Sequence, residues 1–237
     1  NFNFNGWAKY KNINLDKQVP AKVGEFLKIP ITQVLYKGKP VIVEGGAIDS
    51  NGKGTLLTSE ECLMHPSIQV RNPSFTKEDY EAVFKEYLGI TNVIWLGDGI
   101  EGDDTHGHID DLCRFVNEDT IITIVESDPK DSNYKPLQDN LKRLQNAKLE
   151  NDKSPKIVEL PMPKRIDFDG LRLPASYANF LILNNCVLVP TFNDANDRIA
   201  LNTIAECFPN REIVGINAID LIWGFGTLHC LSQQIPE

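Results

Sequence analysis

The sequence lacks the patterns that mark disulfide-rich, zinc-binding or membrane-spanning proteins. Its five cysteines are odd in number, irregularly spaced and contain no Cys-x-x-Cys pair, which argues against a zinc ribbon or a disulfide framework. The longest apolar stretches, such as residues 180–189, fall far short of the roughly 20 residues that a membrane-spanning helix needs. No cleavable signal is visible. We therefore expect a soluble, cytoplasmic protein with reduced cysteines and no membrane partner.

Positive charge is also scarce. Lys and Arg number 24 against 33 Asp and Glu, which gives a net charge of −9. Such a chain is repelled by polyanions, so we expect no nucleic-acid partner. A small cationic substrate would suit it, although acidic proteins more often owe their charge to solubility.

An internal repeat is present in place of these patterns, and its unit is strand, turn, strand, helix and strand. The first copy has the clearest helix, which Thr76 caps at its N-terminus and Gly89 ends. Residues 15–26 and 33–36 are predicted as the helix and last strand of an earlier copy, and another copy begins at Gly226. The predicted strands of the three copies are residues 41–48, 55–58 and 93–96; 109–116, 120–125 and 156–160; and 177–183, 186–189 and 212–216.

The repeat predicts the fold class. Units of about 60 residues that cannot bury an apolar face alone favour α/β blades arranged around a central axis. A doubly wound sheet is the alternative, but its parallel strands need crossovers, whereas each unit here has a hairpin-length connection. We predict one α/β-propeller domain over residues 1–237. Because a closed ring needs more units and the first residue is Asn1 rather than Met, we expect the N-terminal part of the ring to precede this sequence.

Three segments at the starts of successive units could carry chemistry, since equivalent ends of blades converge at the axis. The first is Val43-Glu44-Gly45-Gly46, in which Glu44 is predicted at the end of an apolar strand. Two glycines after it would let another backbone or a ligand approach closely. Glu44 alone would ordinarily be a turn residue, so the other segments decide its interpretation.

The second segment, residues 102–111, holds four acids and two histidines. One interpretation makes His108 a general acid/base, with Asp110 on the same face of a strand because residues i and i+2 point the same way. A rival interpretation makes His106 and His108 a metal-binding pair. That pair would need further ligands. The other histidines are only His65 and His229, so carboxylates or cysteines would have to complete the site, and these show no ligand spacing; we expect no metal.

The third segment, residues 224–234, places two glycines before a short predicted strand that ends in Cys230. A buried structural cysteine is the commoner outcome for such a residue. The repeat argues otherwise, because it aligns this segment with the start of each earlier unit. We therefore expect Cys230 at the axis beside Glu44, His108 and Asp110.

Together the three segments resemble the agmatine deiminase and bacterial peptidylarginine deiminase family, part of the guanidine-modifying pentein superfamily, whose fold is a five-bladed α/β propeller. The resemblance covers nearly the whole chain and is specific in combination. It is carried by residues 4–7, 43–46, 102–105, 107–110, 173–177, 189–190 and 228–230.

The resemblance implies that Cys230 is the nucleophile, that His108 is the acid/base and that Glu44 and Asp110 hold the substrate guanidinium. Asp104 and Gly226 are expected to complete the substrate site. The implied activity is agmatine iminohydrolase, which gives N-carbamoylputrescine and ammonia through an amidino-cysteine intermediate. The resemblance also favours a homo-oligomer, and we expect no cofactor.

Two alternatives and two departures accompany this interpretation. A deiminase of free or peptidyl arginine would need a cation for the substrate carboxylate, and Arg71, Arg114 and Arg172 are candidates. A non-catalytic pentein that serves as a binding platform would need no cysteine, histidine and carboxylates at the axis. The family's Trp-x-Arg-Asp motif is absent, and we expect its aspartate before Asn1. Phe225 stands where the family usually has glycine, which bears on the substrate tail.

Overall fold

The computed structural model of the protein describes residues 1–235. Its main elements are three three-stranded sheets, each built from an antiparallel pair and a parallel third strand. The predicted repeat of strand, strand, helix and strand is confirmed in all three. The blades are β3 (Asp49–Ser50), β4 (Thr55–Ser59), α3 (Lys77–Leu88) and β5 (Asn92–Leu96); β6 (Cys113–Phe115), β7 (Thr120–Val125), α4 (Tyr134–Asn146) and β8 (Lys156–Pro161); and β11 (Leu181–Ile182), β12 (Cys186–Thr191), α5 (Asn196–Cys207) and β13 (Glu212–Asn217).

Helix α3 shows how local sequence fixes these elements. Thr76 Oγ1 accepts the Asp79 N–H at 3.3 Å and the Asp79 carboxylate accepts the Thr76 N–H at 3.0 Å, so the predicted N-cap is a capping box. Gly89 ends the helix in the left-handed region with φ 71°. Tyr80 and Phe84, on one face of the helix, are buried. The predicted helix is therefore confirmed at both ends.

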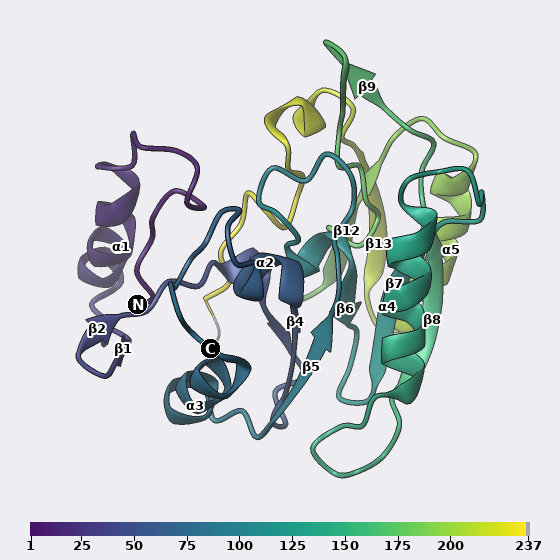
Figure 1. The fold of residues 1–237 in the computed structure, drawn as a ribbon. Helices are drawn as coiled ribbons and strands as arrows, with labels where there is room; N and C mark the ends of the chain where they lie inside the picture. Colours follow the sequence, from purple (N-terminus) through teal and green to yellow (C-terminus); the bar gives the residue numbers. More distant parts are fainter. Residues whose placement is uncertain (236–237) are drawn as a thin grey trace.

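The blade helices hold neighbouring blades together. Helix α4 packs against β7 of its own sheet and β5 of the preceding sheet, and α5 packs in the same way against β13 and β8. Figure 1 shows α4 and α5 on one side of the molecule, with α1 (Val19–Leu27) and the β1–β2 hairpin on the other. The site described below is built by the turns that lead into the first strands of the blades.

The N-terminal segment differs from its prediction in one element. The expected helix over residues 15–26 is present as η1 (Asp16–Gln18) followed by α1. Residues 33–36 were predicted as the last strand of a blade, but β1 (Leu35–Tyr36) instead pairs with β2 (Lys39–Pro40) as an antiparallel hairpin. The left-handed backbone of Lys37 and Gly38, with φ 50° and 76°, turns the chain back at that point.

The first strand of each blade is shorter than predicted. Residues 41–48 contain the 3-10 turn η2 (Gly45–Ala47), and residues 109–116 open with a second one, η3 (Ile109–Asp111). In the third blade, 177–183 contributes only β11. Periodicity cannot separate these turns from strands, because their apolar side chains are buried as those of a strand would be.

Several short elements complete the described fold. Strands β9 (Asp167–Phe168) and β10 (Leu171–Arg172) form a separate hairpin, and α2 (Glu60–Met64) and η4 (Leu221–Gly224) are short helical turns. Within residues 1–235, no helix combines the length and the apolar character needed to cross a membrane.

Candidate active site

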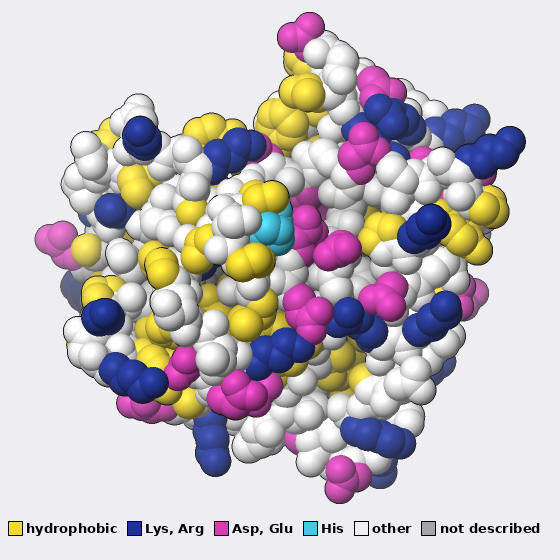
Figure 2. Space-filling model, in the orientation of Figure 1, with side chains coloured by type: hydrophobic (Ala, Val, Ile, Leu, Met, Phe, Trp, Pro, Cys, Tyr) yellow, Lys and Arg dark blue, Asp and Glu magenta, His cyan; other side chains and the backbone are white. Residues whose placement is uncertain are grey.

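A cleft of about 950 Å³ brings together the residues predicted from three distant segments. Its lining includes the four residues predicted as catalytic, Glu44, His108, Asp110 and Cys230. Figure 2 shows acidic side chains beside a partly buried histidine near the middle of one face, with Lys and Arg scattered among acids over the rest of it. Convergence of the three segments is therefore a property of the fold.

Two short turns carry Glu44 and His108. Glu44 is the N-cap residue of η2 and His108 is the N-cap residue of η3, and the two turns contact each other. Gly46 allows this contact, because a Cβ at that position would lie 2.6 Å from His108 Nδ1 and 3.0 Å from an Asp110 oxygen. Close approach of backbone and imidazole, rather than a strand end, explains the Glu-Gly-Gly sequence.

The loop before His108 is organised by Asp103. One carboxylate oxygen of Asp103 accepts the N–H groups of Gly107 and His108, at 2.7 and 2.9 Å. The backbone is left-handed at His106 and Gly107, with φ 65° and 85°. His106 Nε2 lies 3.6 Å from Glu61. The two histidines of the rival metal pair therefore have different partners. Asp110 lies in the 3-10 turn that begins directly after His108, so the two residues do not share a face of a strand.

His108 is buried, and carboxylates lie near both nitrogens of its imidazole. Its Nε2 lies 3.7 Å from Glu44 Oε2 and its Nδ1 lies 4.0 Å from Asp110 Oδ1. Burial alone would lower the pKa of His108, but the neighbouring Cys62 and Glu44 side chains and the charge of Asp110 raise that pKa well above its ordinary value. The imidazole is therefore protonated at neutral pH and can donate a proton.

Glu44 is held by a buried arginine, which answers one open question from the sequence. Arg71 Nε donates to both Glu44 oxygens, at 3.1 and 3.4 Å, and Nη1 donates to Gln69 O at 3.0 Å. Its Nη2 donates to Thr105 O. Burial would raise the pKa of Glu44, but His108 and Arg71 lower it overall. Arg71 therefore keeps this carboxylate ionised and ties together two loops of the cleft.

The adjacent carboxyls Asp110 and Asp111 are both buried, and their surroundings separate them. Asp110 Oδ2 lies 2.7 Å from His229 Nδ1. Burial would raise the pKa of Asp110, but the His229 hydrogen bond and the His108 charge lower it. Burial and the charges of Asp110 and Asp103 raise the pKa of Asp111 well above its ordinary value. Asp110 is therefore the ionised member of the pair.

Asn179 connects Cys230 with this acid pair, and sequence reasoning did not identify it. The side chain is 1% exposed, and its Nδ2 donates to Cys230 Sγ at 3.0 Å. The same amide contacts four more groups: Nδ2 donates to Asp110 (3.2 Å) and Asp111 (3.0 Å), and Oδ1 accepts from Thr227 Oγ1 (2.8 Å) and His229 N (3.0 Å). The only signal was its place just after residues 173–177.

The chain around Cys230 forms a turn, so the predicted short strand is wrong. Asn179 Oδ1 also accepts the Cys230 N–H at 3.3 Å, and Leu231 N donates to Thr227 O. These contacts take up the backbone donors that a strand would have paired across a sheet. Within the described residues, no strand of a fourth unit follows Gly226.

Cys230 is exposed as a residue, but its sulfur faces the buried carboxylates. Its Sγ lies 3.4 Å from Asp110 Oδ2 and within hydrogen-bond distance of Asn179. Desolvation of the thiol and the adjacent carboxyl groups of Asp111 and Asp110 raise the pKa of Cys230 far above its ordinary value. The free thiol is therefore neutral at physiological pH, and a cation in the cleft would favour the thiolate.

The two residues predicted only for substrate binding also lie in the cleft. Asp104 accepts from Tyr10 Oη at 2.7 Å and pairs with Lys9 Nζ. Gly226 lies against the nucleophile candidate, because a Cβ there would come within 2.8 Å of Cys230 Cβ. Phe225 lines the cleft with a left-handed backbone, φ 61°, which glycine would adopt more easily.

The remaining candidate arginines already have partners. Arg114 Nη1 donates to Phe180 O at 3.0 Å and its Nε lies 3.4 Å from Asp49. Arg172 Nη1 donates to Asp131 at 2.7 Å. Arg114 lines the cleft, whereas Arg172 is absent from the lining that the structure describes.

Comparison with known proteins places this geometry in a family. The model of the family described as Porphyromonas-type peptidyl-arginine deiminase matches residues 1–236. An agmatine deiminase of Pseudomonas fluorescens is 34% identical over 256 residues, covering 98% of this chain and 68% of the relative. Among solved structures, an agmatine deiminase of Enterococcus faecalis superposes with a TM-score of 0.91 at 33% identity, covering 100% of this chain and 69% of that one.

A second solved structure is an agmatine deiminase of C. jejuni with substrate bound, with a TM-score of 0.86 at 35% identity. The match covers 97% of this chain and 65% of that protein. The chain thus spans about two thirds of the length of the relatives that it matches. An amidinotransferase of Microseira wollei, with a TM-score of 0.53 at 13% identity, shares the fold.

Proposed function

Because the chain belongs to the Porphyromonas-type peptidyl-arginine deiminase family, we propose that it hydrolyses a guanidinium group with Cys230 as nucleophile. One observation carries the proposal. An ionised, buried Asp110 lies 3.4 Å from the sulfur of an accessible cysteine, in the cleft that also holds Glu44 and His108. A structural cysteine has no need of this setting.

Guanidinium recognition follows from the charges. The ligand is planar, permanently cationic and rich in N–H donors, so fixed carboxylates can orient it. Asp110 and Glu44 are both held ionised by their neighbours, as the lowered pKa of each indicates. The bound cation would lower the pKa of Cys230, so that the thiol gives up its proton to solvent and the thiolate lies beside its target carbon.

The first chemical step forms a bond between Cys230 Sγ and the central guanidinium carbon. His108, protonated beforehand, gives its proton to one nitrogen, and the C–N bond breaks as ammonia leaves. The cysteine then carries an amidino group. In the second step neutral His108 takes a proton from water, the resulting hydroxide adds to the same carbon, and collapse breaks the C–S bond to release a ureido product and the thiol.

We propose agmatine as the substrate. In the cleft that the structure describes, Arg114 is the single Lys or Arg of the lining, and Phe180 and Asp49 already engage it. A free cation for the carboxylate of arginine is thus not offered there. Asp104, an acid of the same lining, would suit the distant ammonium of agmatine, which would replace Lys9 as the cation beside it. The agmatine deiminases among the relatives support this choice.

The substrate proposal is tested by ammonia release from agmatine, free arginine and a peptidyl arginine under identical conditions. We expect agmatine to have the highest kcat/KM. A higher value with arginine or the peptide would transfer the proposal to those substrates. Release from none of the three would remove the hydrolase proposal and favour a non-catalytic binding protein.

Gly46→Ala should lower kcat at least about 100-fold, because its methyl group would push the imidazole of His108 out of place and small misplacements at a reacting centre cost on that order. Gly45→Ala is the matched control, since a Cβ at Gly45 meets nothing within 4 Å. It should keep kcat within about threefold of the wild type, because it leaves the imidazole in place. Steady-state ammonia assays of both variants decide the matter, and equal activity of the two would refute the close approach.

The rate at which iodoacetamide alkylates Cys230 should keep rising with pH above the pH at which the rate of an ordinary cysteine levels off. A normal thiol, with a pKa of about 8.5, approaches its full rate by roughly one unit above that value. The pKa of Cys230 is raised, so less thiolate forms at each pH and the rate should still increase there. Mass spectrometry of the Cys230 peptide gives the rate, and an unstructured peptide of the same sequence is the control. A plateau at or below the pH of the control would contradict the raised pKa.

A further inference from the structure

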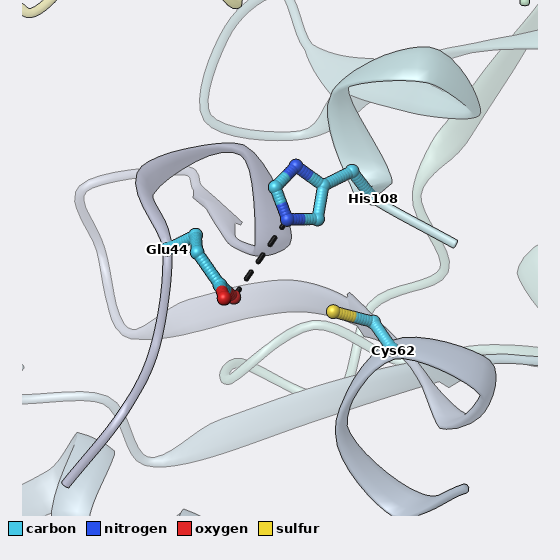
Figure 3. Close-up of side chains that lie close together, drawn as sticks. All are labelled: Glu44, Cys62 and His108. Atoms are coloured by element: carbon cyan, nitrogen blue, oxygen red, sulfur yellow. Dashed lines mark ion pairs between the residues drawn. The ribbon is translucent and has the colours of Figure 1, made fainter. Parts of the chain in front are cut away.

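We propose that Glu44, Cys62 and His108 form a second binding function of this site, for a thiophilic divalent cation such as Zn²⁺. Cys62 has no part in the proposed hydrolysis. Its sulfur, an imidazole nitrogen of His108 and a carboxylate oxygen of Glu44 all lie within 4.8 Å of one another. Figure 3 shows the three side chains pointing toward a common centre from the turn before η2, helix α2 and the start of η3.

The geometry is near that of a tetrahedral metal site. Ligand bonds of about 2.0–2.3 Å place neighbouring ligand atoms of Zn²⁺ roughly 3.3–3.6 Å apart. His108 Nε2 and Glu44 Oε2 are 3.7 Å apart, which is too long for a hydrogen bond and close to such an edge. The Cys62 sulfur lies within 4.8 Å of the other two ligand atoms, so its movement inward would complete three corners.

An unpartnered nitrogen points to a ligand at this place. His108 Nε2 is buried and lacks a hydrogen-bond partner in the described structure, and the whole residue is 5% exposed. A buried polar atom without a partner is unfavourable, so a ligand that fills the position is favoured. Imidazole, thiolate and carboxylate are together the donor set that Zn²⁺ accepts.

Neighbouring charges bear on how strongly the cation is held. Arg71 already engages both oxygens of Glu44 and brings a positive charge against any metal ion. The Cys62 thiol and the protonated imidazole of His108 must also each lose a proton on binding. Both effects weaken the site, so we infer reversible binding rather than a structural metal.

Access is through the substrate cleft, which Glu44 and His108 line. A cation bound there would occupy a carboxylate that we propose for guanidinium binding and the imidazole that we propose for proton transfer. Reversible inhibition that competes with substrate follows. This inhibitory part rests on the proposed function, whereas cation binding itself does not.

Direct binding is tested by titrating metal-free protein carrying Cys230→Ser with Cd²⁺ and Zn²⁺. That background removes the other cysteine cluster, which Asp110, Asp111 and Cys230 form. We expect one Zn²⁺ per chain by calorimetry, and with Cd²⁺ the ultraviolet charge-transfer absorbance of a metal thiolate. Adding Cys62→Ala should abolish that absorbance and weaken Zn²⁺ binding at least about 30-fold, since even second-shell losses cost 10–100-fold.

Cys113→Ala in the same background is the matched control, because Cys113 is also a fully buried cysteine but lies outside both clusters. Its metal affinity should match that of the background. If Cys62→Ala unfolds, Cys62→Ser and the Cd²⁺ absorbance of the folded background still give the answer. Unchanged affinity without Cys62, or no thiolate absorbance in the background, would overturn the proposal.

Inhibition is measured separately with agmatine and the wild-type protein. Zn²⁺ should raise the apparent KM, and EDTA should restore the activity. If the Cys230→Ser protein gives no metal-binding signals while the wild-type protein turns over agmatine, only the cation site is refuted. Intact metal binding in a protein without turnover would instead remove the hydrolase proposal and keep the site.

Discussion

Replacing Cys230 with alanine is expected to abolish turnover, with kcat falling at least about 10⁴-fold, as happens when an enzyme loses its nucleophile. The reason is chemical: Sγ is the atom proposed to bond the guanidinium carbon, and no other sulfur of the described residues lines the cleft. Single-turnover ammonia assays at saturating agmatine measure the loss.

Binding should separate this effect from loss of structure. Asp110 and Glu44 remain in the variant, so their charge contacts with the guanidinium are kept. The dissociation constant of agmatine should therefore lie within about threefold of that of the wild-type protein before reaction. Cys207→Ala is the control, because Cys207 is half-buried at the end of α5 and away from the cleft. It should retain activity. Comparable turnover in both variants would show that Cys230 is not the nucleophile.

Arg71→Met is expected to destabilise the fold by about 3–5 kcal/mol, the usual cost of removing one partner from a buried ion pair. Arg71 is 1% exposed and Glu44 is 9% exposed, so the carboxylate left behind has little water to solvate it. Denaturant unfolding measures the loss. The difference from wild type should shrink as pH falls, because without Arg71 the pKa of Glu44 rises and the neutral carboxyl needs no cation.

A double variant distinguishes the ion pair from simple packing. In Arg71→Met with Glu44→Gln, no buried charge is left uncompensated, so stability should recover by at least about half of the single-variant loss. The double variant should be inactive, because it lacks the Glu44 carboxylate that is proposed to hold the substrate. A loss below about 1 kcal/mol in Arg71→Met, or a double variant less stable than the single one, would contradict the role given to the pair.

The regular elements of this fold could be predicted because their signals are local. A capping residue, helical spacing and a terminal glycine define α3 at Thr76 and Gly89, and both ends are where the sequence placed them. The order of strands and helices then repeats. Because the repeat aligns Glu44, His108 and Cys230, it predicted that they lie close together, and all three line one cleft.

The turns and the supporting residues could not be predicted, because their causes are long-range. Residues 109–111 form a 3-10 turn rather than a strand, and the alternation around His108 does not reveal it. Asn179 acts through contacts with Asp110 and Cys230, which lie 69 and 51 residues away. A lone asparagine in an apolar segment gives no sign of such partners.

Trapping the reaction intermediate tests the central claim most directly. Wild-type protein mixed with excess agmatine and quenched in acid within one turnover should gain the mass of agmatine minus ammonia, since a covalent amidino adduct precedes hydrolysis. Peptide mapping should locate the added mass on Cys230. Ureido product formed without any adduct, or an adduct on another residue, would contradict nucleophilic attack by Cys230.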